Sequence, residues 1–199
     1  MDKRQQLIVT AFELFYRHGI HAVGINQILQ HSGVAKKTLY HHFPGKEALV
    51  EAVVAHRDRN YLEWLDTRLA RAEGDVPAVI EALFDALDDW FNDRVELLTA
   101  FHGCFFINTC GEYGDPEHQV HRRCARHKAA VLTCIAGHLA RCGLEPEKAR
   151  ALADTLGLLK EGAIVQAHVT GDKQAALKGK TLATTLTAPC LEPDRSGNS

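Results

Sequence analysis

Apolar residues recur every three or four positions along most of the 199-residue chain, and glycine, proline or short polar runs interrupt the pattern. This repeat places apolar side chains on one face of an α-helix, whereas a β-strand would alternate them with polar ones. The pattern therefore predicts an all-α fold. About nine helices are expected, over residues 3–18, 25–31, 36–42, 46–72, 77–91, 95–110, 117–141, 146–170 and 173–187.

Residues 33–49 combine a tight turn, a short helix and the start of a long helix. Gly33 permits the turn, and Pro44-Gly45 ends the short helix. One face of that helix is predicted to carry Lys36, Lys37, Tyr40 and His41, and the other Ala35, Leu39 and Phe43. A core helix has no use for adjacent lysines beside a tyrosine, whereas a helix in a DNA groove does. The alternative is an ordinary solvated charged face.

The first 50 residues resemble the N-terminal domain of the TetR family of bacterial transcriptional regulators. The resemblance rests on motifs at fixed spacing, namely Ala11-Phe12-Glu13-Leu14-Phe15 with Gly19, Ile28 before Ser32-Gly33-Val34, Thr38-Leu39-Tyr40-His41-His42-Phe43, and Lys46-Glu47-Ala48-Leu49. It implies a DNA-binding domain over residues 1–47, with the helix-turn-helix at about 24–43. An effector-binding and dimerisation domain is expected over 48–190, followed by a disordered polar tail over 191–199.

The resemblance also implies which residues contact DNA. They are Lys36, Lys37, Thr38, Tyr40, His41 and Lys46. Lysine can bond guanine or a phosphate, and a threonine methyl or hydroxyl can meet thymine or a phosphate. Lys46 begins a helix, where its charge opposes the helix dipole and a phosphate would relieve the conflict. The family usually has Ser or Thr where this chain has Gly24-Ile25, so that cap and phosphate contact is missing or is made by a backbone N–H.

The charge distribution fits a basic DNA-binding domain on a slightly acidic body. Residues 1–47 hold six basic and three acidic residues, and the remainder holds 17 basic and 22 acidic residues. The whole chain therefore has a net charge of −2, with the excess of positive charge at its N-terminus. No apolar run approaches the ~18 residues of a membrane span, and the polar N-terminus does not resemble a signal peptide. We therefore expect a cytoplasmic protein with no membrane partner, whose six cysteines are reduced.

Large side chains of the C-terminal region form a candidate effector pocket. In TetR-like proteins this region encloses a small-molecule effector, here of unknown identity. The candidate lining is Trp64, Phe84, Phe101, His102, Cys104, Phe105, Asn108 and Tyr113. The stretch 101–110 mixes aromatic, thiol and amide groups, and buried polar groups need partners, so His102 and Asn108 would orient a ligand. The alternative is that these aromatics only fill a core.

Residues 153–167 interleave apolar side chains with glycine and alanine, which let helices approach closely. The family pairs its last two long helices with their mates in a four-helix dimer interface. The resemblance therefore places the interface at Leu156, Leu159, Ala163, Ile164 and Ala167. A palindromic operator, read by two symmetric copies, also requires a homodimer. A packed monomeric core remains the alternative.

The cysteines and histidines raise the question of a metal or redox site. Four of them recur every three residues, at His118, His121, Cys124 and His127. Their direction swings by half a circle, so they cannot converge on one ion. Cys134 and His138 are better spaced, but two ligands do not make a site, and we predict no metal site and no cofactor. Sensing of an oxidant or electrophile through Cys104 or Cys110 is the alternative, together with metal binding at the cysteines.

No nucleophile elbow, phosphate-binding loop or zinc-hydrolase spacing occurs, so we predict no catalytic residues and no enzyme activity. The sequence predicts a regulator that binds double-stranded operator DNA. It is most simply a repressor that a small-molecule effector releases from a palindromic operator. The alternative is the same DNA-binding domain, switched by thiol chemistry or by metal binding at the cysteines.

Overall fold

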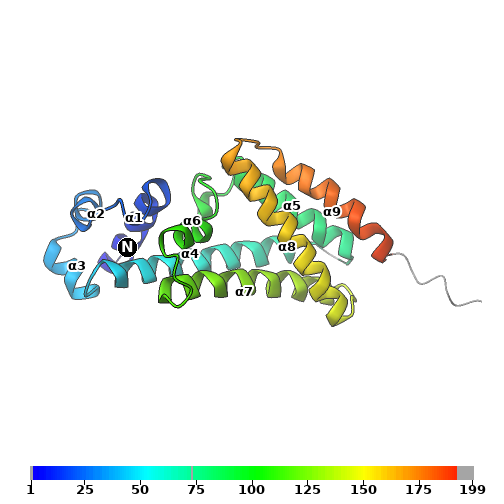
Figure 1. Ribbon diagram of the computed structural model, residues 1–199, viewed down its shortest axis with the longest axis horizontal. Coiled ribbons are helices and arrows are strands. Elements are labelled where there is room, and N and C mark those ends of the chain that lie inside the picture. The colour runs from blue at the N-terminus through cyan, green and yellow to red at the C-terminus, as the bar shows by residue number, and fades with distance from the viewer. Residues whose placement is uncertain (1, 73, 192–199) are drawn as a thin grey trace, which may run out of the picture. The chain divides into compact units, whose positions relative to one another are not determined.

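The computed structural model describes residues 2–72 and 74–191, with side chains up to residue 188 (Figure 1). Over these residues the fold is all-α, as the apolar repeat predicts. It comprises α1 (Lys3–His18), α2 (Ile25–Ser32), α3 (Lys36–His42), α4 (Lys46–Leu69), α5 (Val76–Phe91), the 3-10 turn η1 (Glu96–Leu98), α6 (Phe105–Glu112), α7 (Gln119–Arg141), α8 (Pro146–Val169) and α9 (Ala175–Leu191). The predicted tail lies outside the described residues, apart from Leu191 at the end of α9.

The single long helix predicted over 95–110 is wrong, because the backbone turns twice within that range. Thr99 has φ 60° and Gly103 has φ 79°, and neither value continues a right-handed helix. The side chain of Asp93 holds the turn by accepting a 2.7 Å hydrogen bond from the backbone N–H of Phe101. Phe101 still reaches the core, with its ring 4.8 Å from that of Phe91. Phe101 is therefore apolar because it is buried from a loop, and not because it lies on the inner face of a helix.

The chain forms two compact units. Among the described residues, the first comprises 2–61 and 104–129, and the second 62–72, 74–103 and 130–191. Both α4 and α7 contribute residues to each unit. The predicted DNA-binding domain (1–47) and effector-binding domain (48–190) are defined by what they bind and not by their packing. Their boundary therefore stays a prediction.

In the first unit, α1 packs against α2 and α3 around fully buried Leu7, Ile28 and Leu39. Gly33 adopts the left-handed conformation at the end of α2, as the turn requires. Phe105 of α6 packs its ring 5.4 Å from that of Phe12 in α1. These contacts fix the start of α3 and leave its opposite side open.

In the second unit, α5, α8 and α9 pack side by side (Figure 1). Side chains of neighbouring helices pack directly on the backbone at two glycines. A Cβ at Gly179 would lie 2.7 Å from the Phe84 ring, and one at Gly157 would lie 2.4 Å from a methyl of Leu132. These two glycines therefore serve packing within one protomer.

Candidate nucleic-acid interface

The exposed side of α3 carries four of the predicted DNA-contacting residues. Lys36, Lys37, Tyr40 and His41 are exposed, whereas Leu39 and Phe43 are buried. Thr38 is half-exposed at the edge of this surface. Ala35 does not face the core as expected, because it precedes the first turn of the helix and is exposed. We call Lys36, Lys37, Tyr40 and His41 the α3 face.

Lys46 is less exposed to solvent than the two lysines of the α3 face. Its ammonium lies 5.9 Å from the centre of the Phe15 ring, and the side chain is half-buried. Burial lowers the pKa of Lys46, and the carboxylate of Glu112 works in the opposite direction. A phosphate could still meet Lys46, but part of its charge is already engaged by the protein.

The N-terminus of α2 has no side-chain cap. Gly24 occupies the cap position, and no side chain accepts a hydrogen bond from the first turn. The side-chain cap that TetR-like proteins usually have at this point is therefore missing. A Cβ at Gly24 would meet nothing within 4 Å, and its φ of −86° is open to any residue.

The eight candidate effector residues do not gather within one unit. Trp64, Phe84, Phe101 and His102 belong to the second unit, and Cys104, Phe105, Asn108 and Tyr113 to the first. Several are engaged in packing, Phe84 against Gly179 and Phe105 against α1. Asn108 is exposed, so it is not enclosed as a residue that orients a buried ligand would be. The aromatic cluster of the second unit continues from Trp64 through Trp90 to Phe101.

The candidate dimer residues face the interior of the protomer. Leu156, Ala163, Ile164 and Ala167 are all buried, and Leu159 is half-buried. The four buried side chains leave little area for a second copy to cover, and only Leu159 is partly accessible. Other residues of the same helices are exposed and apolar, among them Leu158, Gly162, Val165 and Val169 on α8, and Leu182 and Leu186 on α9. We call these six residues the apolar surface.

The histidines at positions 118, 121 and 127, just before and along α7, contact separate partners. His118 lies 2.9 Å from Glu47, and His127 lies 2.7 Å from Asp58. His121 lies 2.8 Å from the backbone carbonyl of Tyr113. Their side chains therefore diverge, as the half-circle swing predicts.

Three of the described thiols, those of Cys110, Cys124 and Cys134, do not have the environment of reactive cysteines. Burial raises the pKa of Cys110 and of Cys124, and burial together with Asp66 raises the pKa of Cys134 to about 11. Cys104 is buried, and its sulfur accepts a hydrogen bond from Lys128 at 3.4 Å. Reaction with an oxidant or electrophile needs an accessible thiolate, so the raised pKa values of Cys110, Cys124 and Cys134 and the burial of Cys104 work against it, although Lys128 beside Cys104 does not.

One cluster was missed by the sequence analysis. Asp66 of α4 lies beside Cys134 and His138 of α7, the pair whose spacing alone lacked a third ligand. No local signal could have found it, because 68 residues separate Asp66 from Cys134. Only the packing of α4 against α7 within the second unit brings them together.

Comparisons with known proteins agree with the helix-turn-helix. Residues 7–53 match the family described as bacterial regulatory proteins, tetR family. Residues 78–178 match the C-terminal domain of LmrA/YxaF-like transcriptional regulators. No helix in the described residues has the length and apolarity to cross a bilayer.

Individual relatives extend the similarity over most of the chain. The HTH-type transcriptional regulator Rv0196 of Mycobacterium tuberculosis is 31% identical over 178 residues, which cover 85% of this chain and 86% of that protein. The HTH-type transcriptional repressor ComR of Escherichia coli is 26% identical, with 90% and 87% covered. The structure resembles SCO4454, a TetR-family transcriptional regulator from Streptomyces coelicolor, with a TM-score of 0.81, 28% identity and 96% of each chain covered.

Proposed function

The chain belongs to the TetR family of helix-turn-helix transcriptional regulators, and from this premise we propose that it represses transcription from a palindromic operator. The α3 face is the observation that carries the proposal. Two lysines and two aromatic rings project from a helix whose other side is buried, and all four side chains are exposed. Such a helix matches the width of the major groove of DNA.

Within this proposal, each residue of the interface has a defined part. Lys36 and Lys37 bond guanine edges or phosphates at the start of α3, and Thr38 contacts thymine or a phosphate. Tyr40 and His41 contact the DNA backbone further along the helix. Lys46 adds a phosphate contact from the first turn of α4, weakened by its contact with Phe15.

The apolar surface supplies the second copy that a palindrome requires. Large exposed side chains such as Leu158, 78% exposed, and Val169, 74% exposed, cost free energy in water. Gly162 lies between them with nothing within 4 Å of a Cβ, so a helix of a second copy could approach closely there. We infer that α8 and α9 pair with α8 and α9 of a second copy.

The name of one relative supports repression, whereas release by an effector is our inference. ComR is named a repressor, and the C-terminal region matches a domain family of regulators. We infer that a small molecule binds the second unit near Trp64 and Phe101. A coupling of about 1–3 kcal/mol between effector and operator would be enough for regulation.

Selection of genomic DNA fragments by the purified protein, repeated at two salt concentrations, tests the proposal. A single palindromic motif should be enriched, and its affinity should fall steeply with salt because phosphate contacts release counterions. The double variant Lys36→Ala/Lys37→Ala should lose the motif, while Lys148→Ala, an exposed lysine of α8, should keep it. Enrichment of the same motif by the double variant would overturn the role of the α3 face.

A further inference from the structure

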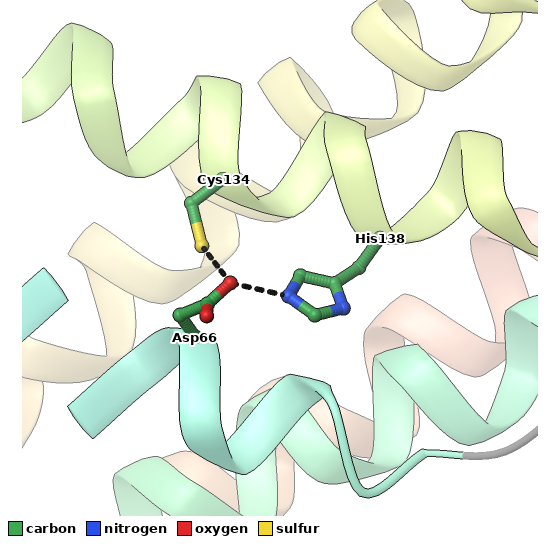
Figure 2. Close-up of side chains that lie close together, drawn as sticks. All are labelled: Asp66, Cys134 and His138. Atoms are coloured by element: carbon green, nitrogen blue, oxygen red, sulfur yellow. Dashed lines mark hydrogen bonds and ion pairs between the residues drawn. The ribbon is translucent and has the colours of Figure 1, made fainter. Parts of the chain in front are cut away.

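Three side chains with metal-binding atoms converge in the second unit. Figure 2 shows Asp66 of α4 pointing toward Cys134 and His138, which lie one turn apart on α7. An oxygen of Asp66 is 2.9 Å from Nε2 of His138 and 3.9 Å from Sγ of Cys134. The three ligand atoms lie within 4.8 Å of one another, and this is the one such group in the part of the chain that the structure describes.

The donor set selects a class of metal. A thiolate, an imidazole and a carboxylate together suit borderline divalent ions, of which Zn²⁺ is the commonest in proteins. Mg²⁺ and Ca²⁺ prefer oxygen ligands alone, so a site with one carboxylate does not suit them.

The two distances from Asp66 are close to those of a bound ion, whereas the distance between Cys134 and His138 is limited only by the 4.8 Å span of the group. Zn²⁺ bonds of about 2.0–2.3 Å at tetrahedral angles separate neighbouring ligand atoms by about 3.3–3.6 Å. The Asp66–His138 distance is about 0.4 Å too short, and the Asp66–Cys134 distance is about 0.4 Å too long. Small rotations of side chains would correct both, and Asp66 is free to rotate because its side chain is 63% exposed.

The cluster opens to solvent. Asp66 and Cys134 line an open cleft of about 340 Å³ together with Leu62, Ala130, Thr133, Gly137 and Arg141. A hydrated ion can enter by this route, and three protein ligands leave a fourth position for water. The positive charge of Arg141 opposes a cation, but a bound thiolate and carboxylate supply two negative charges against it.

We propose that Asp66, Cys134 and His138 bind one Zn²⁺-like divalent ion, whose fourth ligand faces the cleft. The ion would link α4 to α7 in place of the hydrogen bonds now centred on Asp66. This site goes beyond the proposed function, and its test needs no operator.

Titration of the metal-free full-length protein with Co²⁺, a spectroscopic substitute for Zn²⁺, tests the site. We expect one Co²⁺ per chain at this site, with a sulfur-to-metal charge-transfer band and the visible bands of a four-coordinate ion. Added Zn²⁺ should displace it. Cys134→Ser should abolish the charge-transfer band, and Asp66→Asn should weaken binding by more than the roughly 10–100-fold that loss of an outer-shell partner costs.

Cys142→Ser is the matched control, since this thiol is also half-buried but lies outside the cluster. It should leave both the band and the affinity unchanged. Asp66→Asn changes an exposed group, so its loss of binding cannot be attributed to misfolding. The proposal fails if the unaltered protein shows no charge-transfer band, or if the band survives in Cys134→Ser. It also fails if Asp66→Asn binds Co²⁺ as tightly as the unaltered protein.

Discussion

The α3 face and the apolar surface are both exposed in the protomer, yet their chemistry is opposite. The α3 face consists of two lysines and two aromatic rings on a helix of seven residues. The apolar surface consists of leucine, valine and glycine on two helices of 24 and 17 residues. Lysine side chains are normally exposed to water, whereas a group of exposed leucines and valines is unusual unless another surface covers it.

This difference indicates what each surface binds. A cationic surface gains free energy from phosphates mainly through counterion release, so its partner is an anion and its affinity depends on salt. An apolar surface gains free energy by removing area from water, so its simplest partner is an identical surface. Substitutions in the two surfaces should therefore differ in how far they weaken operator binding, and also in how strongly that loss depends on salt concentration.

The largest effect is expected from the apolar surface. Leu158→Glu/Val169→Glu would place carboxylates against their symmetry mates and dissociate the dimer. Loss of the second half-site contact should weaken operator binding by about 100-fold or more. Analytical ultracentrifugation would give the oligomeric state and fluorescence anisotropy the affinity. Leu97→Glu, at another exposed leucine, is the control and should remain a dimer.

A smaller effect is expected from a single residue of the α3 face. Lys37→Ala should lower specific operator binding by ~1–3 kcal/mol while the protein stays dimeric. Competition between operator and unrelated DNA would measure the specific part. Equal losses on both DNAs would instead identify Lys37 as a phosphate contact.

The stability of the first unit offers a test that involves neither surface. The carboxylate of Glu112 accepts hydrogen bonds from the backbone N–H groups of Ile20 and His21, at 2.7 and 2.5 Å. Glu112→Gln turns an amide toward one of these donors and should lower the free energy of unfolding by about 1–3 kcal/mol. Urea denaturation would measure the change. Glu117→Gln removes a surface ion pair with Arg122 and should cost less than about 1 kcal/mol.

Lys46→Ala should weaken binding to all DNA sequences about equally, because a phosphate contact carries no base information. The slope of log affinity against log salt should fall by about 1. An unchanged slope would show that the contact with Phe15, and not a phosphate, occupies this charge. Lys148→Ala, in the second unit, should leave the slope unaltered.

The smallest effect is a pH dependence of stability. Burial lowers the pKa of His56, and the charges of Arg59 and Arg57 lower it further. The unfolded chain therefore binds the proton more readily, so stability is complete above pH ~6.5 and falls as the pH drops below it. His56→Gln should reduce this slope in urea denaturation between pH 7 and pH 5. His18→Gln, at an exposed histidine, should leave it unchanged.

Much of the fold could be predicted because it depends on local chemistry. The bounds of α1 and α3 were predicted at the residues observed, since Gly19 and Pro44-Gly45 stop these helices whatever packs around them. The division of α3 into a buried side at Leu39 and an exposed cationic side also follows from its own sequence. The helix predicted over 95–110 failed because burial of Phe101 in a loop imitates the helical repeat.

The sequence alone determined the fold class, the family and the α3 face, because turn residues, periodicity and charge act within a few positions of the chain. The tertiary structure decided which side of α8 is exposed. That helix is apolar on several sides, so only its packing against α5, α7 and α9 separates buried Leu156 from exposed Leu158. It also decided the partners of Cys134 and His138, because Asp66 becomes their neighbour only after the chain has closed a loop of 68 residues.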